Sequence, residues 1–444
     1  MVSNLLTKPA TVGALACQRN SFMFNGFKTT VISCEPNKGK QNDSTKFLVE
    51  LQDTIFFPEG GGQPSDTGFL IYSNDSIPVS YVSRVGLHAK HHVGQYIEPG
   101  TTVEAEIDQR KRIDYMQQHT GQHLLSAILE SEPYELGTLS WSMGGTLSSK
   151  KPTLEINDYF YIELPRKLTT QEIEELSYKL NNLTSVNPLQ IYVVERRADT
   201  HGNGKTSKIP VDYDLEKGIL RTVHIGSMDS NPCCGTHLQN TGQIGSILLS
   251  PNQTNVRRLN SRLYFMCGNR VVNYGMAVNR LIGSTKNVLS CSESEIPEKV
   301  ERQRDLIQKS SKREQFWIKE LASYESNILL NNVKENGKTF LLRDEYGVLE
   351  LLPQVFKEFT NKLGDATDEY LLVLCGREKS SETGSVLVVS ESGDKISSIA
   401  SSLSSVVPTL RGGGSKKGGK WQGKIVKFTE GYWNSVKRYL ETEF

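Results

Sequence analysis

The stretch MQQHTGQHLL, residues 116–125, places two histidines, His119 and His123, four positions apart. Around it, between Arg110 and Glu130, apolar residues recur close to the helical period, at positions 113, 116, 124, 125, 128 and 129. The pattern predicts a helix over 110–130. Side chains four apart project from one face of a helix, so the two imidazoles can share a metal ion. Without further ligands, two such histidines are more often ordinary polar residues.

A second motif, PCCGTH at residues 232–237, supplies a thiol and a third imidazole four positions apart. One cysteine with three histidines suits Zn²⁺ and does not suit Mg²⁺ or Ca²⁺, which prefer oxygen ligands. We therefore expect one zinc ion per chain, bound by His119, His123, Cys233 and His237. Cys234 is an alternative ligand, although the spacing to His237 favours Cys233. A cysteine outside the ligand set is most often a small buried residue.

The composition excludes several classes of protein. The 444 residues suffice for two or three domains, and 51 Lys and Arg against 50 Asp and Glu give a net charge of +1. This balance excludes a histone-like polycation or an acidic-tail protein, but not a nucleic-acid binder whose charge is zoned along the chain. No apolar run approaches about 18 residues, so no membrane span is expected. The N-terminus lacks the features of a secretory signal, and seven scattered cysteines argue against a disulfide framework, so we expect a cytoplasmic protein.

The order of expected elements predicts an α+β fold. Residues 18–105 contain short runs such as Phe47–Leu51 and Val79–Val82, punctuated by Gly, Asn, Asp and Pro, which indicate a small β-barrel. The loop PEGGGQP at 58–64 cannot be helical, because three consecutive glycines favour a turn or a close backbone approach. Four domains are expected: a Gly-rich barrel, a two-layer α/β zinc-binding domain, a long helical linker and a C-terminal α/β domain, over 1–107, 108–275, 276–335 and 336–444.

The zinc-binding domain alternates strands with a second helix. Thr169 and Glu172 resemble a capping box at the start of a helix over 169–180. A loop containing Gly, Lys and His is expected over 199–209. The expected strands are at about 154–164, at 189–194, near 219–225 and near 244–249.

Residues 298–333 are charged and nearly free of glycine, which predicts a long helix or a short coiled coil. Val300, Ile307, Leu321 and Ile328 follow a seven-residue spacing that Glu314 interrupts. Such a helix can join two copies of the chain into a homodimer through 298–333. The alternative is an ordinary surface helix with one buried stripe.

The C-terminal region combines buried strands with a basic segment. Apolar runs at 370–375 and 385–389 indicate a buried sheet, with Cys375 in its core. The segment 411–427 is rich in glycine and lysine, and we expect it to be a flexible loop that contacts RNA phosphates, with an aromatic ring able to stack on a base. The residues expected to do so are Lys416, Lys417, Lys420, Trp421 and Lys424. The alternative is a solvated turn.

The remaining histidines carry less information. His88, His91 and His92 have no cysteine or acid at ligand spacing, so a solvated loop is expected. No partner for His201 or His224 can be identified from the sequence.

The two histidine motifs together resemble the editing domain of alanyl-tRNA synthetase. The resemblance extends to FPEGGGQPSDTG at 57–68, to GNRV at 268–271 and to the basic Gly-rich segment near the C-terminus, in the family's order. It covers nearly the whole chain, which is similar to the long, free-standing alanyl-tRNA editing proteins of eukaryotes (AlaX). One departure is Cys234, where the family more often has glycine.

The resemblance implies a deacylase that acts in trans on tRNA(Ala) carrying the wrong amino acid, chiefly serine and also glycine. It implies that Zn²⁺ is the cofactor and that the four side chains above are its ligands. No aminoacylation core is present, so charging activity is not implied. Two alternatives stay open: editing of Ser-tRNA(Thr), and a catalytically silent, zinc-stabilised tRNA-binding protein.

The site residues implied fall into two groups. Catalysis would involve His119, His123, Gln118 and Cys233, with Gln122 as a further polar neighbour. The substrate would contact the glycine loop and a hydroxyl that distinguishes serine from alanine. These substrate-binding residues are Thr29, Thr30, Gly60, Gly61, Gly62 and Gln63.

Overall fold

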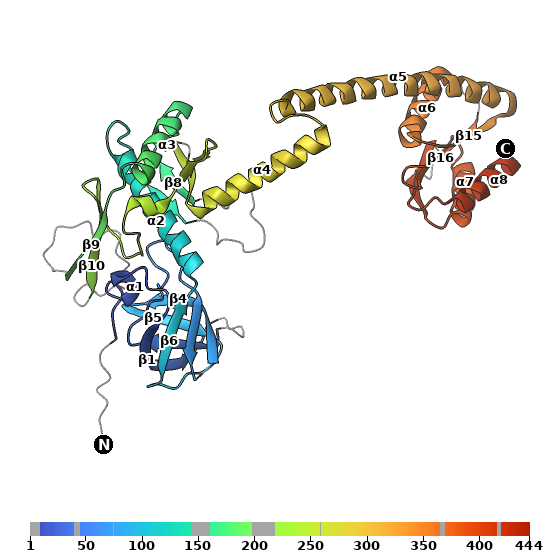
Figure 1. The fold of residues 1–444 in the computed structure, drawn as a ribbon. Coiled ribbons are helices and arrows are strands. Elements are labelled where there is room, and N and C mark those ends of the chain that lie inside the picture. Colours follow the sequence, from blue (N-terminus) through green and yellow to red (C-terminus); the bar gives the residue numbers. More distant parts are fainter. Residues whose placement is uncertain are drawn as a thin grey trace. The chain divides into compact units, whose positions relative to one another are not determined.

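The computed structural model describes residues 9–39, 45–73, 75–143, 160–197, 218–257, 259–364, 369–414 and 419–444. The chain divides into two compact units, Met1–Thr285 and Lys286–Phe444. Figure 1 labels their helices and strands. The expected α+β class is confirmed, whereas the division into four domains stays a prediction.

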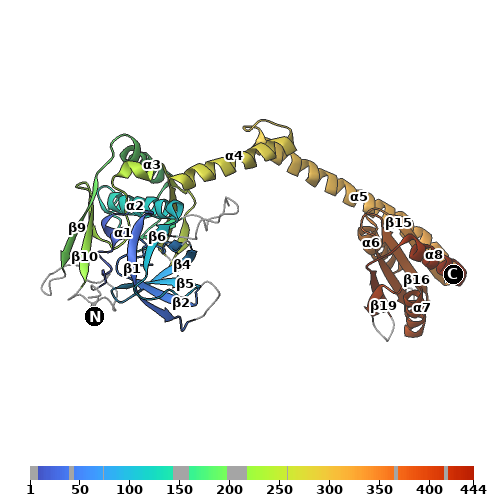
Figure 2. The same ribbon diagram turned by 60° about the horizontal axis from the view of Figure 1, so that its bottom comes forward.

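The first unit begins with a closed six-stranded barrel, as expected from its punctuated β-type sequence. Its strand order is β1-β2-β5-β4-β3-β6, and β1 closes the barrel by pairing with β6. Figure 2 shows the barrel beside helix α2. The strands are β1 (Phe27–Pro36), β2 (Phe47–Leu51), β3 (Gly68–Tyr72), β4 (Asp75–Val85), β5 (His88–Val93) and β6 (Thr102–Ile107). The short helix α1 (Ala16–Arg19) packs its buried residues against the barrel core.

The prediction of a solvated loop around His88, His91 and His92 was wrong. These residues form strand β5, and His91 is fully buried. Its two ring nitrogens lie 2.9 Å from Oγ1 of Thr54 and 3.0 Å from the carbonyl oxygen of Val49. Burial lowers the pKa of His91 to about 4, so the ring is a neutral core residue. The sequence misled because His91 takes the inward position between Ala89 and Val93 in the two-residue period of a half-buried strand.

Helix α2 (Gln109–Glu130) is the predicted helix, extended by one residue at its start. Asp108 caps it by accepting a hydrogen bond from the backbone N–H of Lys111. Most of the helix is buried all round, because the barrel meets its N-terminal end and a sheet packs along the rest. The predicted helix at 169–180 is α3 (Thr170–Ser185), and its capping box is present.

The sheet that covers α2 and α3 has the order β12-β14-β8-β7, with β13 also paired to β14. Its strands are β7 (Ser140–Ser142), β8 (Phe160–Leu164), β12 (Ile247–Leu249), β13 (Thr254–Val256) and β14 (Asn260–Cys267). Residues 154–159 of the expected strand and all of the expected loop at 199–209 lie outside the described residues. A 3₁₀ helix, η3 (Thr241–Ile244), leads into β12, so the strand starts later than the apolar pattern at 244–249 suggests.

A separate three-stranded ribbon carries the chain to the second histidine motif. Its order is β11-β10-β9, formed by β9 (Ile191–Arg197), β10 (Ile219–Ile225) and β11 (Asp229–Pro232). The last residue of β11, Pro232, directly precedes Cys233. The ribbon therefore sets where the second motif lies.

A buried ion pair connects the barrel to α2. The guanidinium of Arg112 is fully buried and binds both carboxylate oxygens of Asp66. It also donates to the carbonyl oxygens of Ser21, at 2.9 Å, and Ile55, at 2.6 Å. Three acceptor groups from three parts of the chain thus converge on one side chain of α2, which fixes the helix against the barrel.

The second unit is an α/β sandwich. Helix α4 (Asn269–Leu289) crosses the boundary between the two units, and α5 (Ile296–Asn336) is the predicted long helix. Its C-terminal half packs on α6 (Val348–Leu363), whereas Val300, Ile307 and Trp317 are exposed. Pairing of two copies through 298–333 stays a prediction.

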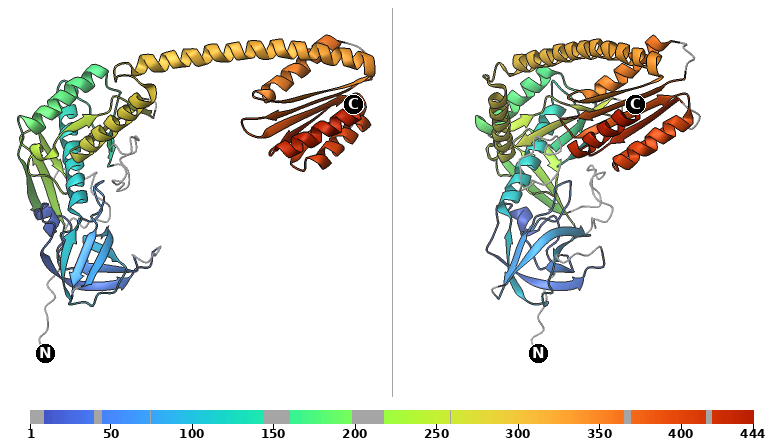
Figure 3. Two further views of the ribbon diagram at one scale, coloured as in Figure 1. Left: turned by 45° about the vertical axis from the view of Figure 1, so that its right-hand side comes forward. Right: turned by 90° about the vertical axis from the view of Figure 1, so that its right-hand side faces the viewer.

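The sheet of this unit has the order β15-β16-β17-β19-β18, with a single parallel pair, β15 and β16. Helices α5 and α6 cover one face, and α7 (Gly393–Val406) and α8 (Glu430–Glu443) cover the other, as Figure 3 shows. Cys375 is fully buried in β16, as expected. The strands are β15 (Lys338–Glu345), β16 (Leu371–Glu378), β17 (Thr383–Ser390), β18 (Leu410–Gly414) and β19 (Gly419–Ile425).

The basic segment is not the flexible loop that its glycines suggested, as far as it is described. Most of the segment forms strands β18 and β19. Residues 415–418, which include Lys416 and Lys417, lie between these strands and outside the described residues. Glycine occurs here because the indole of Trp421 lies across the ribbon: a Cβ on Gly412 would come within 2.4 Å of it, and one on Gly423 within 2.5 Å. Among the described residues, no helix has both the length and the apolar character needed to cross a membrane.

Candidate metal centre

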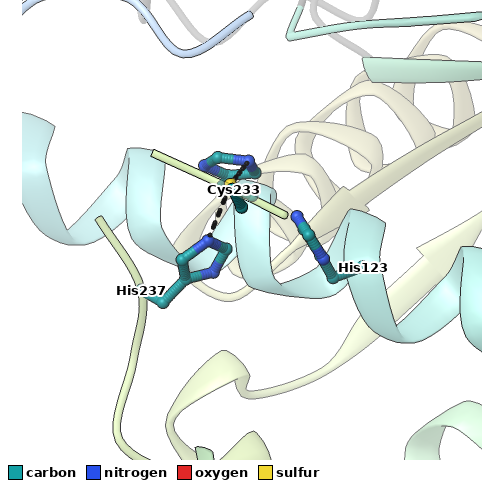
Figure 4. Close-up of side chains that lie close together, drawn as sticks. His123, Cys233 and His237 are labelled. Carbon is teal, nitrogen blue, oxygen red and sulfur yellow. Dashed lines mark hydrogen bonds between the residues drawn. The ribbon is translucent and has the colours of Figure 1, made fainter. Parts of the chain in front are cut away.

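The two histidine motifs meet, as expected. His119 and His123 project from α2, and Cys233 and His237 come from the segment after β11. One ligand atom from each of these four residues lies within 4.8 Å of every other. The sulfur of Cys233 is 3.4 Å from Nε2 of His119 and 3.2 Å from Nε2 of His237. Figure 4 shows the rings of His123 and His237 turned toward Cys233.

Each imidazole is held at its other nitrogen. Nδ1 of His119 lies 2.9 Å from Oε1 of Gln63, and Nδ1 of His123 lies 3.2 Å from Oδ2 of Asp229. Nδ1 of His237 lies 3.3 Å from Oγ1 of Thr120. With Nδ1 engaged in all three rings, Nε2 is the atom that each ring offers to a shared centre.

The electrostatics of Cys233 and His237 favour metal ligation, whereas His123 must lose a proton to bind a metal. Burial raises the pKa of the Cys233 thiol, but the neighbouring His119 and His237 outweigh it and bring the pKa well below its usual value. Burial also disfavours a charged His123, but hydrogen bonds with Asp229 and Cys233 raise its pKa to about 9. Burial lowers the pKa of His237 to about 3. A thiolate beside a neutral imidazole is the protonation state that a metal requires.

The cluster could hold a metal ion, and the two distances from Cys233 fit zinc. In a tetrahedral site with Zn–N and Zn–S bonds of about 2.1 and 2.3 Å, neighbouring ligand atoms are roughly 3.5 Å apart. The two measured Sγ–Nε2 distances, 3.4 and 3.2 Å, are close to this value. The chemistry of the donors, one thiolate and three imidazoles, suits the same metal.

The glycine loop lies against this centre. At Gly62 the backbone φ is +82°, and an added Cβ would come within 2.5 Å of the indole of Trp141. That indole stacks on the ring of His119, with centroids 5.4 Å apart. A Cβ on Gly61 would approach the sulfur of Cys234 to 3.1 Å. Cys234 therefore faces the loop, whereas Cys233 faces the histidines.

Two side chains hold the segment of the second motif from behind. Gln18 donates to the carbonyl oxygen of Cys234 at 2.7 Å. Arg221, in β10, donates to the carbonyl oxygens of Gly235, at 2.9 Å, and of Gln18, at 2.7 Å. These contacts, like Trp141 and Asp229, were missed by sequence analysis. Only Asp229, four residues before Cys233, had a position that could have drawn attention to it.

The other residues expected at the site lie in different surroundings. Gln118 is fully buried, and its amide bonds to the backbone of Cys267 and to the Asp114 carboxylate. Gln122 donates to Oγ of Ser126. Neither contact is with a histidine of the cluster, so we assign Gln118 no direct part in the chemistry.

No described contact joins Thr29 or Thr30 to the four residues of the metal cluster. The hydroxyl of Thr29 donates to the carbonyl oxygen of Asp53 and accepts from its N–H. Thr29 also lines a cavity of ≈ 400 Å³ whose lining includes none of the four cluster residues. Thr30 is half-buried and accepts a backbone hydrogen bond from Gln52.

The basic segment presents its charges on one face of β19. Lys420 and Lys424 are exposed, and the ammonium of Lys420 lies 5.2 Å from the ring centre of Phe356. Trp421 lies between them in sequence and points to the opposite face, where it packs against the core beneath α7 and α8. The lysines and the indole therefore cannot contact a bound RNA from the same face of the strand.

Comparison with known proteins identifies the family. Residues 220–264 match the family model described as the threonyl and alanyl tRNA synthetase second additional domain. The chain is 56% identical over 448 residues to a Saccharomyces cerevisiae protein named alaX, with 98% of each chain covered. It is 31% identical to the alanyl-tRNA editing protein Aarsd1-B of Xenopus laevis, over 94% of this chain and 95% of the relative. The alanine–tRNA ligase of Pyrococcus furiosus is 29% identical over 82% of this chain but only 38% of the ligase. The chain therefore belongs to the family of alanyl-tRNA editing proteins.

Proposed function

We propose that this protein is a zinc-dependent deacylase that acts in trans on Ser-tRNA(Ala), and also on Gly-tRNA(Ala), hydrolysing the ester between the amino acid and the tRNA. The observation that carries the proposal is the convergence of His119, His123, Cys233 and His237 beside the glycine loop. Family membership supports the tRNA substrate.

The ester is a labile bond, so the protein needs to hold it in place and polarise its carbonyl group rather than supply a covalent nucleophile. Bound zinc would supply a Lewis acid beside the ester. The main chain at Gly61 and Gly62 would bind the small aminoacyl group, and the missing side chains let the loop pack closely against Trp141 and Cys234 beside the centre. The indole of Trp141 covers one side of His119 and keeps water from that side of the centre.

Four protein ligands close the coordination of zinc, which is the arrangement of structural sites. A catalytically silent, zinc-stabilised tRNA-binding protein is therefore the alternative that the experiment must separate. The purified protein is incubated with Ser-, Gly- and Ala-tRNA(Ala) and with Ser-tRNA(Thr), and release of the amino acid is measured.

We expect rapid release of serine from tRNA(Ala), slower release of glycine and little release of alanine. The variant His119→Ala should lose at least about 100-fold in rate, since removing a ligand must cost more than the 10- to 100-fold typical of a residue that only supports one. Its far-ultraviolet circular dichroism should stay unchanged. Rapid release from Ser-tRNA(Thr) alone would show that this tRNA is the substrate instead. No release from any substrate would support the catalytically silent tRNA-binding protein.

Discrimination of serine from alanine would come from a hydroxyl that pairs with the serine side chain. Thr30 remains the candidate, because the hydroxyl of Thr29 already bonds twice to the backbone of Asp53. Exchanging both threonines for valine should erase the preference for serine over alanine. An unchanged preference would remove both residues from the proposal.

A further inference from the structure

We infer that Gln63, the last residue of the glycine loop motif GGGQ, is a positioning residue that fixes the ring of His119 for metal binding rather than a contact for the substrate. The inference rests on the proposed metal centre but not on the identity of the tRNA. It assigns Gln63 a different part from the one that the sequence suggested.

The hydrogen-bond network determines the orientation of the Gln63 amide. The backbone N–H of Thr236 can only donate, and it lies 2.9 Å from Oε1 of Gln63. Oε1 is therefore the acceptor, and Nε2 is the donor to Oγ1 of Thr236 at 2.8 Å. Because Oε1 also lies 2.9 Å from Nδ1 of His119, that nitrogen must carry the hydrogen. The lone pair on Nε2 of His119 is then left facing the sulfur of Cys233.

Burial leaves Gln63 no room for a second role. The side chains of Gln63, His119 and Thr236 are all fully buried. Gly235 is packed so tightly between them that a Cβ there would come within 2.2 Å of the His119 ring and 2.8 Å of Oε1 of Gln63. The backbones of Gly60 and Gln63 also bond to each other in both directions, which closes the loop behind the amide. Among the described contacts, the Gln63 side chain is the one through which the loop hydrogen-bonds to a histidine of the cluster.

Asp229 orients the ring of His123 in the same way. Its carboxylate can only accept when ionised, and it lies 3.2 Å from Nδ1 of that ring. The two rings of α2 are therefore oriented by partners from distant parts of the first unit's sequence. Gln63 is the neutral partner, which allows a test that adds a negative charge without removing the acceptor.

The test compares Gln63→Met with Gln63→Glu by zinc affinity, measured in competition with a chromophoric chelator. Methionine has a similar length but no acceptor, so the affinity should fall by about 10- to 100-fold, the usual effect of losing a partner of a metal-bound histidine. Glutamate keeps an acceptor for His119 and for Thr236 N–H, and the Thr236 hydroxyl can turn to donate to it. Its negative charge near the cation should leave zinc affinity equal to or tighter than that of the native protein.

Other roles predict a different order. If Gln63 only fills space, Gln63→Met should bind zinc normally and Gln63→Glu should bind it worse, because it buries a charge. If Gln63 contacts the substrate, neither variant should change zinc affinity while both raise KM. Either result would overturn the inference. The control Gln122→Met, another buried glutamine of this region, should leave zinc affinity unchanged, since its described contact is with Ser126.

A second measurement needs no variant. In the zinc-loaded native protein, long-range ¹H–¹⁵N correlation spectra distinguish a ring protonated at Nδ1 from one protonated at Nε2. We expect the His119 ring to be protonated at Nδ1, and protonation at Nε2 would refute the inference even if Gln63→Met failed to fold. Neither measurement involves tRNA, so a failure of the proposed deacylase activity would leave both results standing.

Discussion

The indole of Trp141 stacks on the imidazole of His119, with ring centroids 5.4 Å apart and planes inclined by 29°. Trp141 is also the one tryptophan in the sequence of the first unit, since the other three are Trp317, Trp421 and Trp433. Its emission should therefore report on the metal centre directly.

Addition of zinc to metal-free protein should change the tryptophan fluorescence, because the ring against the indole passes from an uncoordinated to a metal-bound state. The change should saturate at one equivalent of zinc. Trp141→Phe should abolish it, while the three tryptophans of the second unit keep their emission. A response that survives in Trp141→Phe would show that the signal arises elsewhere.

Gly62→Ala should disturb the same contact. A Cβ at Gly62 would lie within 2.5 Å of the Trp141 ring, so the indole must move away from His119. We expect weaker zinc binding, by up to about 10-fold given the indirect effect, and an altered emission spectrum. Gly86→Ala is the matched control, because Gly86 also has a positive φ, +58°, but no atom within 4 Å of an added Cβ. Both variants should lose about 1 kcal/mol of stability from backbone strain, but only Gly62→Ala should alter the spectrum or the zinc affinity.

Zinc affinity should depend on pH through His123. Hydrogen bonds with Asp229 and Cys233 outweigh burial and raise its pKa to about 9, so below that pH the metal-free ring carries a proton. The thiol of Cys233 and the ring of His237 have lowered pKa values, so they contribute no further proton near neutrality.

Binding should consequently release about one proton per zinc at pH 7, and the affinity should fall about tenfold for each pH unit below 9. Calorimetry in buffers of different ionisation enthalpy measures the proton release. An affinity that is constant between pH 6 and pH 9 would contradict the protonation of His123.

Much of this centre could be predicted, and the part that could not has a physical reason. The four ligand side chains follow from residue type and from the four-residue spacings within each motif. Their partners Gln63 and Asp229 do not, because they act through hydrogen bonds between segments whose proximity only the folded chain establishes. Gln63 lies 56 residues from His119, and Asp229 lies 106 residues from His123.

The same distinction applies to the fold. The barrel strands and α2 were predicted because alternation and helical spacing are local properties of the sequence. His91 was misjudged because two hydrogen bonds, to Thr54 and to the Val49 carbonyl, satisfy its ring inside the barrel. Strands β18 and β19 were misjudged because their glycines make room for the Trp421 ring instead of a flexible loop. In both cases a tertiary contact overrides the local preference.

Asp66→Asn should destabilise the first unit strongly. It leaves the fully buried guanidinium of Arg112 without its counter-charge, which typically costs about 3–5 kcal/mol. Arg19→Gln removes a cation that is half exposed and also paired with an aspartate, Asp53, and should cost less than about 1 kcal/mol. Guanidinium denaturation followed by circular dichroism compares the two variants, and equal losses would contradict the structural part assigned to Arg112.

The double variant Lys420→Ala and Lys424→Ala should weaken tRNA binding at low salt. If each lysine neutralises one phosphate, the slope of log affinity against log salt should become shallower by about 2. The control, Lys309→Ala with Lys312→Ala, removes two exposed lysines from α5 instead. If both pairs flatten the slope equally, the effect would be one of total charge, and the two lysines of β19 would have no special part.

The anchoring of Cys234 by Gln18 has a consequence for synthesis of the protein. The two residues are 216 positions apart in the sequence. The residues that form and support the metal centre are therefore spread over most of the first unit's sequence. A nascent chain can close its barrel early, yet it cannot complete the ligand set until His237 has emerged from the ribosome. Prematurely terminated products that end before this residue would therefore have a folded start but no place to retain the metal.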